Sequence, residues 1–360
     1  MKPFNYALCI MHYKLIKKIL SWFTSPSLGR VGVGLLFTLL LTACVDVDEY
    51  QSDVESNMEA LWTIMDEHYC FFAEKEEQLG VNWDEVHERY RRNVDNRMTR
   101  YQLFEFLSNM VGELRDGHVN ISASFDYARN WSWKEDYPKN FSDSLQRKYL
   151  GTKYGIASGI YYRVLDDNVG YMYVGSFQDS FGDGNLDEIL YALAPCNGLI
   201  IDVRNNGGGQ LTEAQRLASR FCNERKLVGY MAHKTGTGRL DFSAREEQWL
   251  EASAGIRWQK KVCVLSNRSV YSAANEFVKY MKALGHTVVG DVTGGGSGMP
   301  FSAELPNGWG VRFSACPMYD VNGVSTENGV APSVTVNMTD EDFQRGEDTI
   351  IETARKIIRE

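Results

Sequence analysis

Three residues in separate stretches of the sequence could carry nucleophilic chemistry. Ser272 in "VYSAANEF" follows an apolar segment and opens an expected helix, whose N-terminal amides favour negative charge. His118 in "LRDGHV" follows another apolar segment, and an imidazole titrates close enough to neutrality to act as a general base. Glu327 in "STENGVAPSV" precedes an Asn-Gly turn. Each residue alone also has an ordinary explanation, since serine is a favoured helix N-cap and Glu327 fits a plain loop glutamate.

A run of glycines adds a candidate site for a negatively charged oxygen. The stretch "IIDVRNNGGGQL", residues 200–211, begins like a buried strand and ends in three glycines at 207–209. Glycine lacks a Cβ, so it permits positive φ angles and lets another group approach its amide. Bare N–H groups at the end of a rigid strand suit an oxyanion, but a tight turn would use the same residues. We interpret Asp202 and Arg204 in this stretch as structural residues that hold the loop by hydrogen bonds.

The chain before and around the histidine is expected to be helical. Apolar residues recur at helical spacing over residues 54–74, which predicts an amphipathic helix. A second helix is expected over 100–114, where Thr99 and Gln102 could form a capping box ahead of an apolar face. Residues 122–155 are rich in Trp, Tyr, Asp, Ser and Lys without a clean period, which indicates a long loop or lid.

From residue 156 onward, short β-rich segments alternate with helical ones. Strands are expected in "GIYYRVL", "VGYMYVGSF", "GLIIDVR", "KKVCVLSN" and "HTVVGDV". Helices are expected in "LDEILYAL", "TEAQRLASRFC", "SAANEFVKYMKAL" and "DTIIETARKII". Asn307 and Gly308 lie between alternating flanks and indicate a hairpin. The alternation predicts an α/β protein with right-handed βαβ units and a central sheet covered by helices.

The N-terminus has the pattern of an export signal. Basic residues precede the apolar run "VGVGLLFTLLLTAC" at residues 31–44, and small residues end it. The ending "LTAC" resembles a bacterial lipobox, in which Cys44 would be lipidated and become the mature N-terminus. The run is shorter than the ~20 residues of a membrane span, although an uncleaved membrane helix is the alternative. We therefore expect a lipid anchor on Cys44 and a location in the cell envelope, with Met1 or Met11 as the start.

Composition excludes several classes of protein. The formal net charge of −9 argues against a nucleic-acid partner, which normally requires a basic face. The cysteines outside the leader are scattered and lack C-x-x-C spacing, so neither a zinc site nor a disulfide framework is indicated. The sequence has no H-E-x-x-H motif, and "VYSAA" is not the G-x-S-x-G elbow of an α/β-hydrolase. No metal or other cofactor is expected.

Taken together, the four stretches around these residues, in this order, resemble the S41 peptidases, the C-terminal processing and tricorn-core group. The resemblance covers roughly residues 55–358. It implies an α/β fold with a crotonase/ClpP-like ββα spiral core and a small N-terminal helical bundle. It also implies that Ser272 is the nucleophile. The oxyanion hole would use the backbone amide of Gly207 or Gly208 together with that of Ala273.

The resemblance also bears on the identity of the general base. One branch of the family uses a lysine in a "T-x-G-K-G" stretch, but this sequence reads "DVTGGGSGMP" with Gly296 at that position. Lys279 lies inside the expected helix instead. The tricorn-like branch uses a histidine with a supporting polar residue and a glutamate, which implies His118 as base and Glu327 as support. The residue before the histidine is serine in tricorn but Gly117 here, so the full tetrad is not matched.

The expected function is that of a lipid-anchored serine endopeptidase acting on proteins or peptides in the cell envelope. The alternative is a catalytically degenerate member that binds peptide or a hydrophobic ligand without cleavage. Only about 35 residues separate "DGHV" from the next strand, too few for an inserted PDZ module. The expected division is a lipoprotein signal peptide at 1–44, an acidic tether at 45–55, a helical domain at 56–121, the aromatic loop or lid at 122–155 and a catalytic core at 156–360.

Overall fold

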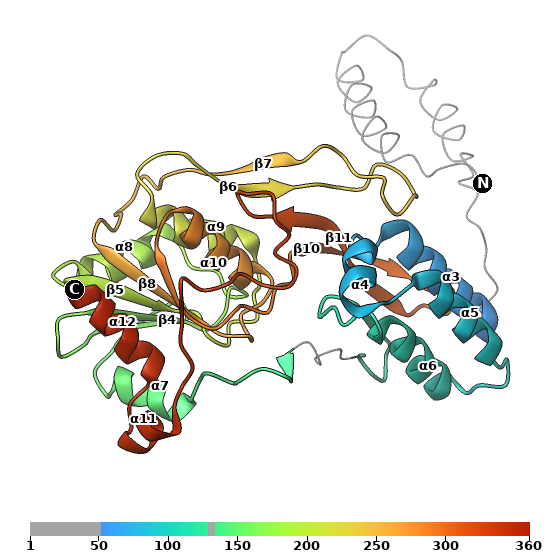
Figure 1. Ribbon diagram of the computed structural model, residues 1–360, viewed down its shortest axis with the longest axis horizontal. Helices are drawn as coiled ribbons and strands as arrows, with labels where there is room; N and C mark the ends of the chain where they lie inside the picture. The colour runs from blue at the N-terminus through green and yellow to red at the C-terminus, as the bar shows by residue number, and fades with distance from the viewer. Residues whose placement is uncertain (1–51, 129–133) are drawn as a thin grey trace, which may run out of the picture.

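The computed structural model describes residues 52–128 and 134–360. The expected signal peptide with Cys44, most of the acidic tether and residues 129–133 of the expected lid lie outside the described residues. Figure 1 shows an α/β core and a helical region that are joined by long strands. None of the helices in the described part combines the length and the apolar character that a membrane span needs.

The helical region contains a break that periodicity alone did not reveal. Its helices within the described residues are α3 (Val54–His68), α4 (Phe72–Leu79), α5 (Trp83–Asn93) and α6 (Arg100–Gly112). The single helix expected over 54–74 is therefore wrong. At Tyr69 the backbone leaves the helical conformation and becomes extended, with ψ 133°. The next N–H, that of Cys70, donates to Ser314 O at 3.0 Å. Since Ser314 belongs to the distant strand β11 (Gly310–Tyr319), a tertiary contact ends the helix.

Helix α6 leads into the segment that holds His118. It begins at a capping box formed by Thr99 and Gln102, as predicted. Its buried apolar face consists of Leu103, Phe104, Leu107, Met110 and Val111. Beyond the helix, β1 (Asn120–Ser122) pairs antiparallel with β11. His118 is therefore held between a packed helix and a paired strand.

The core is built around a sheet with the order β12-β9-β8-β5-β4-β3-β2. Its strands are β2 (Gly155–Ala157), β3 (Ile160–Val164), β4 (Gly170–Val174), β5 (Gly198–Asp202), β8 (Lys261–Ser266), β9 (Thr287–Gly290) and β12 (Val334–Thr335). Strands β4, β5, β8, β9 and β12 run parallel, while β3 and β2 are antiparallel additions. The strands predicted from the alternating pattern correspond to β3, β4, β5, β8 and β9 and are confirmed.

Helices cover both faces of this sheet (Figure 1). One face packs against α8 (Asp183–Leu193), α9 (Leu211–Ala218) and α10 (Ala273–Ala283), with a 3₁₀ turn at Ser219–Phe221. The other packs against α7 (Asp143–Leu150) and α12 (Thr349–Arg359), beside the short α11 (Asp340–Arg345). Helices α8, α9, α10 and α12 confirm the prediction. Helix α7 lies where a loop or lid was expected, because eight residues are too few for periodicity to reveal a helix.

A second sheet connects the core to the helical region. Strand β10 (Gly298–Glu304) pairs with β11 across the hairpin predicted at Asn307 and Gly308. Strands β6 (Lys226–Met231) and β7 (Glu246–Leu250) extend the sheet and were not predicted. In Figure 1 their connection reaches from the core to the helices. There Arg239 pairs with Asp66 on α3 and Asp84 on α5, so this arm fixes the helical region relative to the core.

Candidate active site

Ser272 lies at the junction between the loop after β8 and helix α10. Its backbone has φ 58° and ψ −125°, in the positive-φ region that serine rarely adopts. Such a conformation costs on the order of 1–3 kcal/mol and persists only where the surroundings hold it. Here the Ser272 N–H donates to Gly295 O at 2.8 Å, and the Tyr271 N–H donates to Asn206 O at 3.0 Å. The turn therefore holds the serine at the N-terminus of α10.

The structure brings His118 to this serine, although the two are 154 residues apart in the chain. Nε2 of His118 and Oγ of Ser272 lie 3.0 Å apart, within hydrogen-bond distance. The His118 residue is only 4% exposed, and its ring packs against the Tyr271 ring. Burial lowers the pKa of His118 to about 4, although the Asp116 carboxylate acts in the opposite direction. The imidazole is therefore neutral at pH 7 and can accept the hydroxyl proton.

The glycine run packs directly against the nucleophile turn. A Cβ at Gly208 would lie 2.7 Å from Tyr271 O and 2.8 Å from Ser272 Cβ, and the φ angle there is +100°. Any larger residue at this position would therefore overlap the backbone around the serine. A Cβ at Gly209 would lie 2.2 Å from the Phe177 backbone. Glycine is thus required at both positions because the loop packs closely against the neighbouring backbone. This packing places the loop beside the Ser272 side chain.

Two backbone donors remain available at this junction. The hydrogen bonds found among the described residues include no acceptor for the N–H groups of Gly207 and Ala273. The Gly208 N–H, by contrast, donates to Asn206 Oδ1 at 2.9 Å. Of the two glycines predicted for the oxyanion hole, the structure therefore favours Gly207. The pairing of Gly207 with Ala273 as oxyanion donors stays a prediction.

Glu327 lies in a buried polar cluster and makes no hydrogen bond with the histidine. Its Oε1 lies 3.3 Å from Lys75 Nζ, and its Oε2 accepts a hydrogen bond from the Ser297 N–H at 3.0 Å. Nδ1 of His118 is buried without a hydrogen-bond partner among the described residues. Burial and then the Asp116 carboxylate raise the pKa of Glu327 to about 8, against the effect of Lys75. The contact between glutamate and base that the resemblance suggested is therefore not seen.

Two buried charged residues at the site were not singled out by the sequence analysis. Asp116 accepts hydrogen bonds from the His118 N–H at 2.8 Å and the Tyr271 hydroxyl at 3.2 Å. Lys75 on α4 makes the 3.3 Å contact with Glu327 described above. The sequence feature that could have drawn attention to Asp116 is its position two residues before the candidate base. Lys75 lies in the polar stretch "AEKEEQ", which looks like a solvated helix surface and carried no signal.

Gly296 stands where the other branch of the family has its lysine, and close packing leaves no space for a side chain there. A Cβ at Gly296 would lie 2.4 Å from the Tyr271 ring, and the φ angle of Gly296 is +76°. Lys279 on α10 forms a buried ion pair with Glu276 and donates to Gln248 and to a backbone carbonyl. None of its hydrogen bonds among the described residues involves the serine. This geometry favours the histidine as the base.

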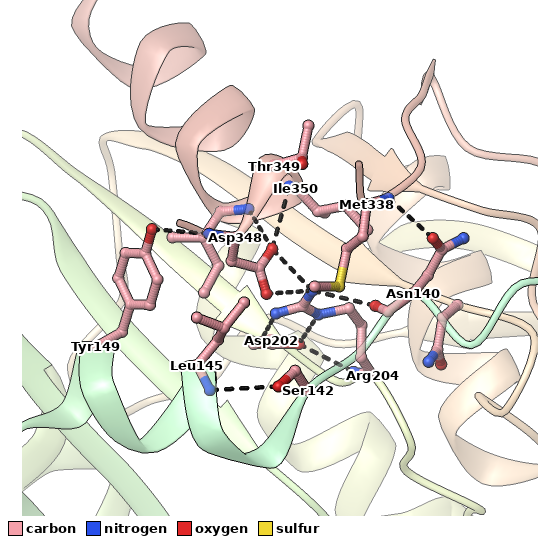
Figure 2. A network of polar contacts seen from close by, with 12 residues as sticks. Asn140, Ser142, Leu145, Tyr149, Asp202, Arg204, Met338, Asp348, Thr349 and Ile350 are labelled. Atoms are coloured by element: carbon pink, nitrogen blue, oxygen red, sulfur yellow. Dashed lines mark hydrogen bonds and ion pairs between the residues drawn. The ribbon is translucent and has the colours of Figure 1, made fainter. Parts of the chain in front are cut away.

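A buried arginine links the glycine loop to the rest of the core (Figure 2). Arg204 follows β5, and its guanidinium pairs with Asp202 at 2.7 Å and with Asp348 at 2.9 Å. It also donates to Asn140 O at 3.2 Å. Asp348 in turn caps α12 by accepting from the N–H groups of Ile350 and Ile351. These contacts agree with a structural role for Asp202 and Arg204, because they tie the start of the glycine loop to α12 and to the segment before α7.

A cavity of about 820 Å³ lies beside the serine and histidine. Its walls include Gly117, Gly207 and Tyr271 from the site itself. The remaining lining residues are Lys134, Glu135, Tyr137, Pro138, Lys139, Phe141, Asp143, Asn205, Arg268 and Ser269. The Arg268 guanidinium lies 4.2 Å from the Tyr137 ring centre, so the segment before α7 forms one wall. No group of three or more His, Cys, Asp or Glu side chains in the described part could hold a metal ion.

Comparisons with known families and structures agree with this architecture. The model of peptidase family S41 matches residues 168–336, and that of the tricorn protease C1 domain matches residues 50–112. A candidate peptidase from Parabacteroides merdae ATCC 43184 is 50% identical, with a TM-score of 0.81 over 86% of this chain and 97% of its own.

Two more distant structures show the fold alone. Mature CPAF complexed with lactacystin has a TM-score of 0.66 at 11% identity, over 85% of this chain and 97% of its own. The tricorn protease has a TM-score of 0.51 at 17% identity, over 85% of this chain and 36% of its own. The expected α/β fold with an N-terminal helical region is thereby confirmed. From the match to the Parabacteroides protein and the two family models, this chain belongs to peptidase family S41, a family of serine peptidases.

Proposed function

We propose that the protein is a serine endopeptidase in which Ser272 is the nucleophile and His118 the general base. One observation carries the proposal. The Ser272 hydroxyl lies 3.0 Å from a buried histidine nitrogen, on a turn with positive φ at the start of a helix. A nucleophile and a base within hydrogen-bond distance form the minimal unit of covalent acyl transfer.

The reaction follows from this arrangement. Nε2 of His118 takes the hydroxyl proton as Oγ of Ser272 forms a bond to the peptide carbonyl carbon, whose oxygen becomes an anion. The N–H groups of Gly207 and Ala273 donate to that oxyanion, at about 3 Å in a productive complex. The imidazolium then gives its proton to the leaving amine, and the carbon–nitrogen bond breaks. A water molecule, deprotonated by the same imidazole, hydrolyses the acyl-enzyme and regenerates the serine.

We assign the reaction to a Ser–His pair rather than a Ser–Lys dyad. The support for this choice is the packing at Gly296, which leaves no room for a lysine, and the engagement of Lys279 with Glu276. Glu327 is assigned an indirect role as a buried acid behind the pair. The degenerate, peptide-binding alternative draws on Gly117 in place of serine and on the unpartnered Nδ1 of His118. It is less favoured, because binding alone requires neither the strained serine nor its contact with a base.

The substrate is proposed to be a protein or peptide of the cell envelope. This rests on the sequence of the leader, where Cys44 ends a short apolar run of the lipobox type. A lipid on Cys44 would tether the catalytic core to a membrane surface. Metabolic labelling with a fatty-acid analogue should mark the wild type but not Cys44→Ser. Equal labelling of both would contradict the anchor without touching the catalytic assignment.

The catalytic proposal is tested with a fluorophosphonate probe and a peptide library. The wild type should be labelled on Ser272 and should cleave peptides, whereas Ser272→Ala should lose both activities by a factor of about 10⁴ or more. Ser269→Ala is the matched control, since Ser269 lines the same cavity, whereas the hydrogen bond of His118 Nε2 is made with Ser272. Labelling that survives in Ser272→Ala, or a folded wild type that is never labelled, would refute the assignment.

A further inference from the structure

Asp116 is a carboxylate buried to 1% exposure between the two parts of the proposed catalytic pair. We propose that Asp116 is a positioning residue, which sets the geometry of His118 relative to Ser272 and provides the negative charge facing the imidazolium. The inference rests on the proposed function, because it assigns a partner to that same base and nucleophile. It differs from the expectation drawn from the family resemblance, in which Glu327 has the supporting role.

One oxygen of Asp116 connects the two catalytic segments. Its Oδ1 accepts from the backbone N–H of His118 at 2.8 Å and from the hydroxyl of Tyr271 at 3.2 Å. Tyr271 immediately precedes Ser272 in the chain. The base and the nucleophile come from segments 154 residues apart, so a shared acceptor couples their positions. A displacement of about 1 Å between such groups can lower a rate about 10²-fold.

The other oxygen fixes this bridge to the helical region and the second sheet. Oδ2 of Asp116 accepts from the Tyr69 hydroxyl at 3.1 Å and from Ser314 Oγ at 2.8 Å. Tyr69 is the residue at which α3 ends, and Ser314 lies in the middle of β11. All four donors therefore come from different chain segments that converge on one carboxylate. A carboxylate held by four hydrogen bonds has little freedom to move.

The charges around Asp116 favour its ionised form. Burial alone would raise the pKa of Asp116, but the Lys75 ammonium, His118 and the donated hydrogen bonds outweigh it and hold that pKa below its usual value. The titratable groups that face the carboxylate are Lys75, His118, Glu327, Tyr69, Tyr271 and Cys70. Glu327 uses its two oxygens for Lys75 and Ser297. Asp116 is thus the carboxylate that bonds to the histidine residue itself, through its main chain.

The substitution Asp116→Asn separates charge from shape. The amide oxygen can take the place of Oδ1, which faces a backbone N–H that only donates. The amide nitrogen then faces the hydroxyls of Tyr69 and Ser314. Each hydroxyl can rotate its O–H away and accept a hydrogen bond from the amide N–H instead of donating one. Asn therefore keeps all four contacts and removes the charge. We expect the rate constant for fluorophosphonate reaction at Ser272 to fall by about 10- to 100-fold at pH 7. The acidic limb of its pH profile should move to lower pH, because a neutral neighbour stabilises the imidazolium less.

Two further variants keep the test decisive if Asp116→Asn folds poorly. Tyr271→Phe removes the link to the nucleophile segment, and it should slow the probe reaction while leaving the acidic limb in place. Tyr69→Phe removes one bond on the side remote from the pair, and it should lower the melting temperature with less than a threefold change in rate. Ser272→Ala reports separately on the proposed function, since an unreactive wild type would end both proposals.

Three results would overturn the inference while leaving the proposed function intact. The first is a folded Asp116→Asn variant that reacts at the wild-type rate. The second is a slower Asp116→Asn variant whose acidic limb does not move and whose rate matches that of Tyr69→Phe. The third is a Tyr271→Phe variant that reacts as fast as the wild type.

Discussion

Substitution of Gly208 by alanine is the sharpest test of the packing beneath the nucleophile. The added Cβ would lie 2.7 Å from Tyr271 O, 2.8 Å from Ser272 Cβ and 3.0 Å from Ala273 N. All three are backbone or Cβ atoms, so no flexible side chain can move aside. The φ angle of +100° is also one that alanine rarely adopts. Either the loop or the serine turn must therefore move.

The magnitude of the effect follows from these two sources of strain. A non-glycine residue in a sparsely populated backbone region costs on the order of 1–3 kcal/mol. Overpacking a well-packed site by one methyl group costs typically another 1–3 kcal/mol. Gly208→Ala should therefore reduce the free energy of unfolding by about 2–6 kcal/mol. If the loop relaxes instead, a displacement of about 1 Å at the oxyanion donors should lower the rate of acyl transfer by about 10²-fold.

The assay compares Gly208→Ala with Gly207→Ala in the same loop. Gly207 has no heavy atom within 4 Å of an added Cβ, so Gly207→Ala should retain wild-type stability. It serves as a control for stability only, since Gly207 lines the cavity beside the serine. Urea unfolding gives the free energies, and the fluorophosphonate reaction gives the rates. A Gly208→Ala protein that matches Gly207→Ala in stability and the wild type in rate would show that the loop does not pack against the serine turn as described.

Two further predictions concern stability. The pKa of His118 is about 4 in the folded protein against an ordinary value near 6.5, so the unfolded chain binds an extra proton between these values. Its contribution of about 3 kcal/mol is complete above pH 6.5 and is lost as the pH falls towards 4. Urea unfolding at several pH values should show a weaker pH dependence in His118→Gln, and equal slopes would contradict the depressed pKa. Arg204→Met should lose about 3–5 kcal/mol, because it leaves the buried carboxylates of Asp202 and Asp348 unpaired. Arg355→Met, which breaks the more exposed pairs of this α12 residue with Asp167 and Glu352, should lose only about 0–1 kcal/mol, and similar losses in both variants would argue against the buried network.

Local patterns in the sequence predicted many of the helices and strands. The capping box of Thr99 and Gln102 sets the start of α6, and the Asn307–Gly308 turn sets the β10–β11 hairpin. Each of these signals depends on residues that are neighbours in the chain, so no tertiary information is needed. The α3–α4 break at Tyr69 and the β6–β7 arm escaped prediction. Both depend on contacts with β11, which is far away in the sequence.

The candidate site likewise has residues that the sequence indicated and contacts that it did not. The residue types and the order of the motifs pointed to Ser272 and His118 as a pair, and the glycine run pointed to bare amides. The sequence did not indicate that Lys75 is buried against Glu327, because the two are 252 residues apart and Lys75 lies in a polar helix. Nor did it indicate that Gly208 uses its own amide internally, since that depends on the side-chain orientation of Asn206.

The sequence by itself determined which chemical groups this protein has and which local elements carry them. Helix caps, turns and strand periodicity act over a few residues, so they can be recognised from the chain alone. Only the tertiary structure decided the 3.0 Å distance between His118 and Ser272 and the convergence of four donors on Asp116. Distances of this kind depend on the packing of the helical region against β11 and on the loops at the ends of the parallel strands. That packing is a property of the whole fold, because each contact is held in place by contacts made elsewhere in the chain.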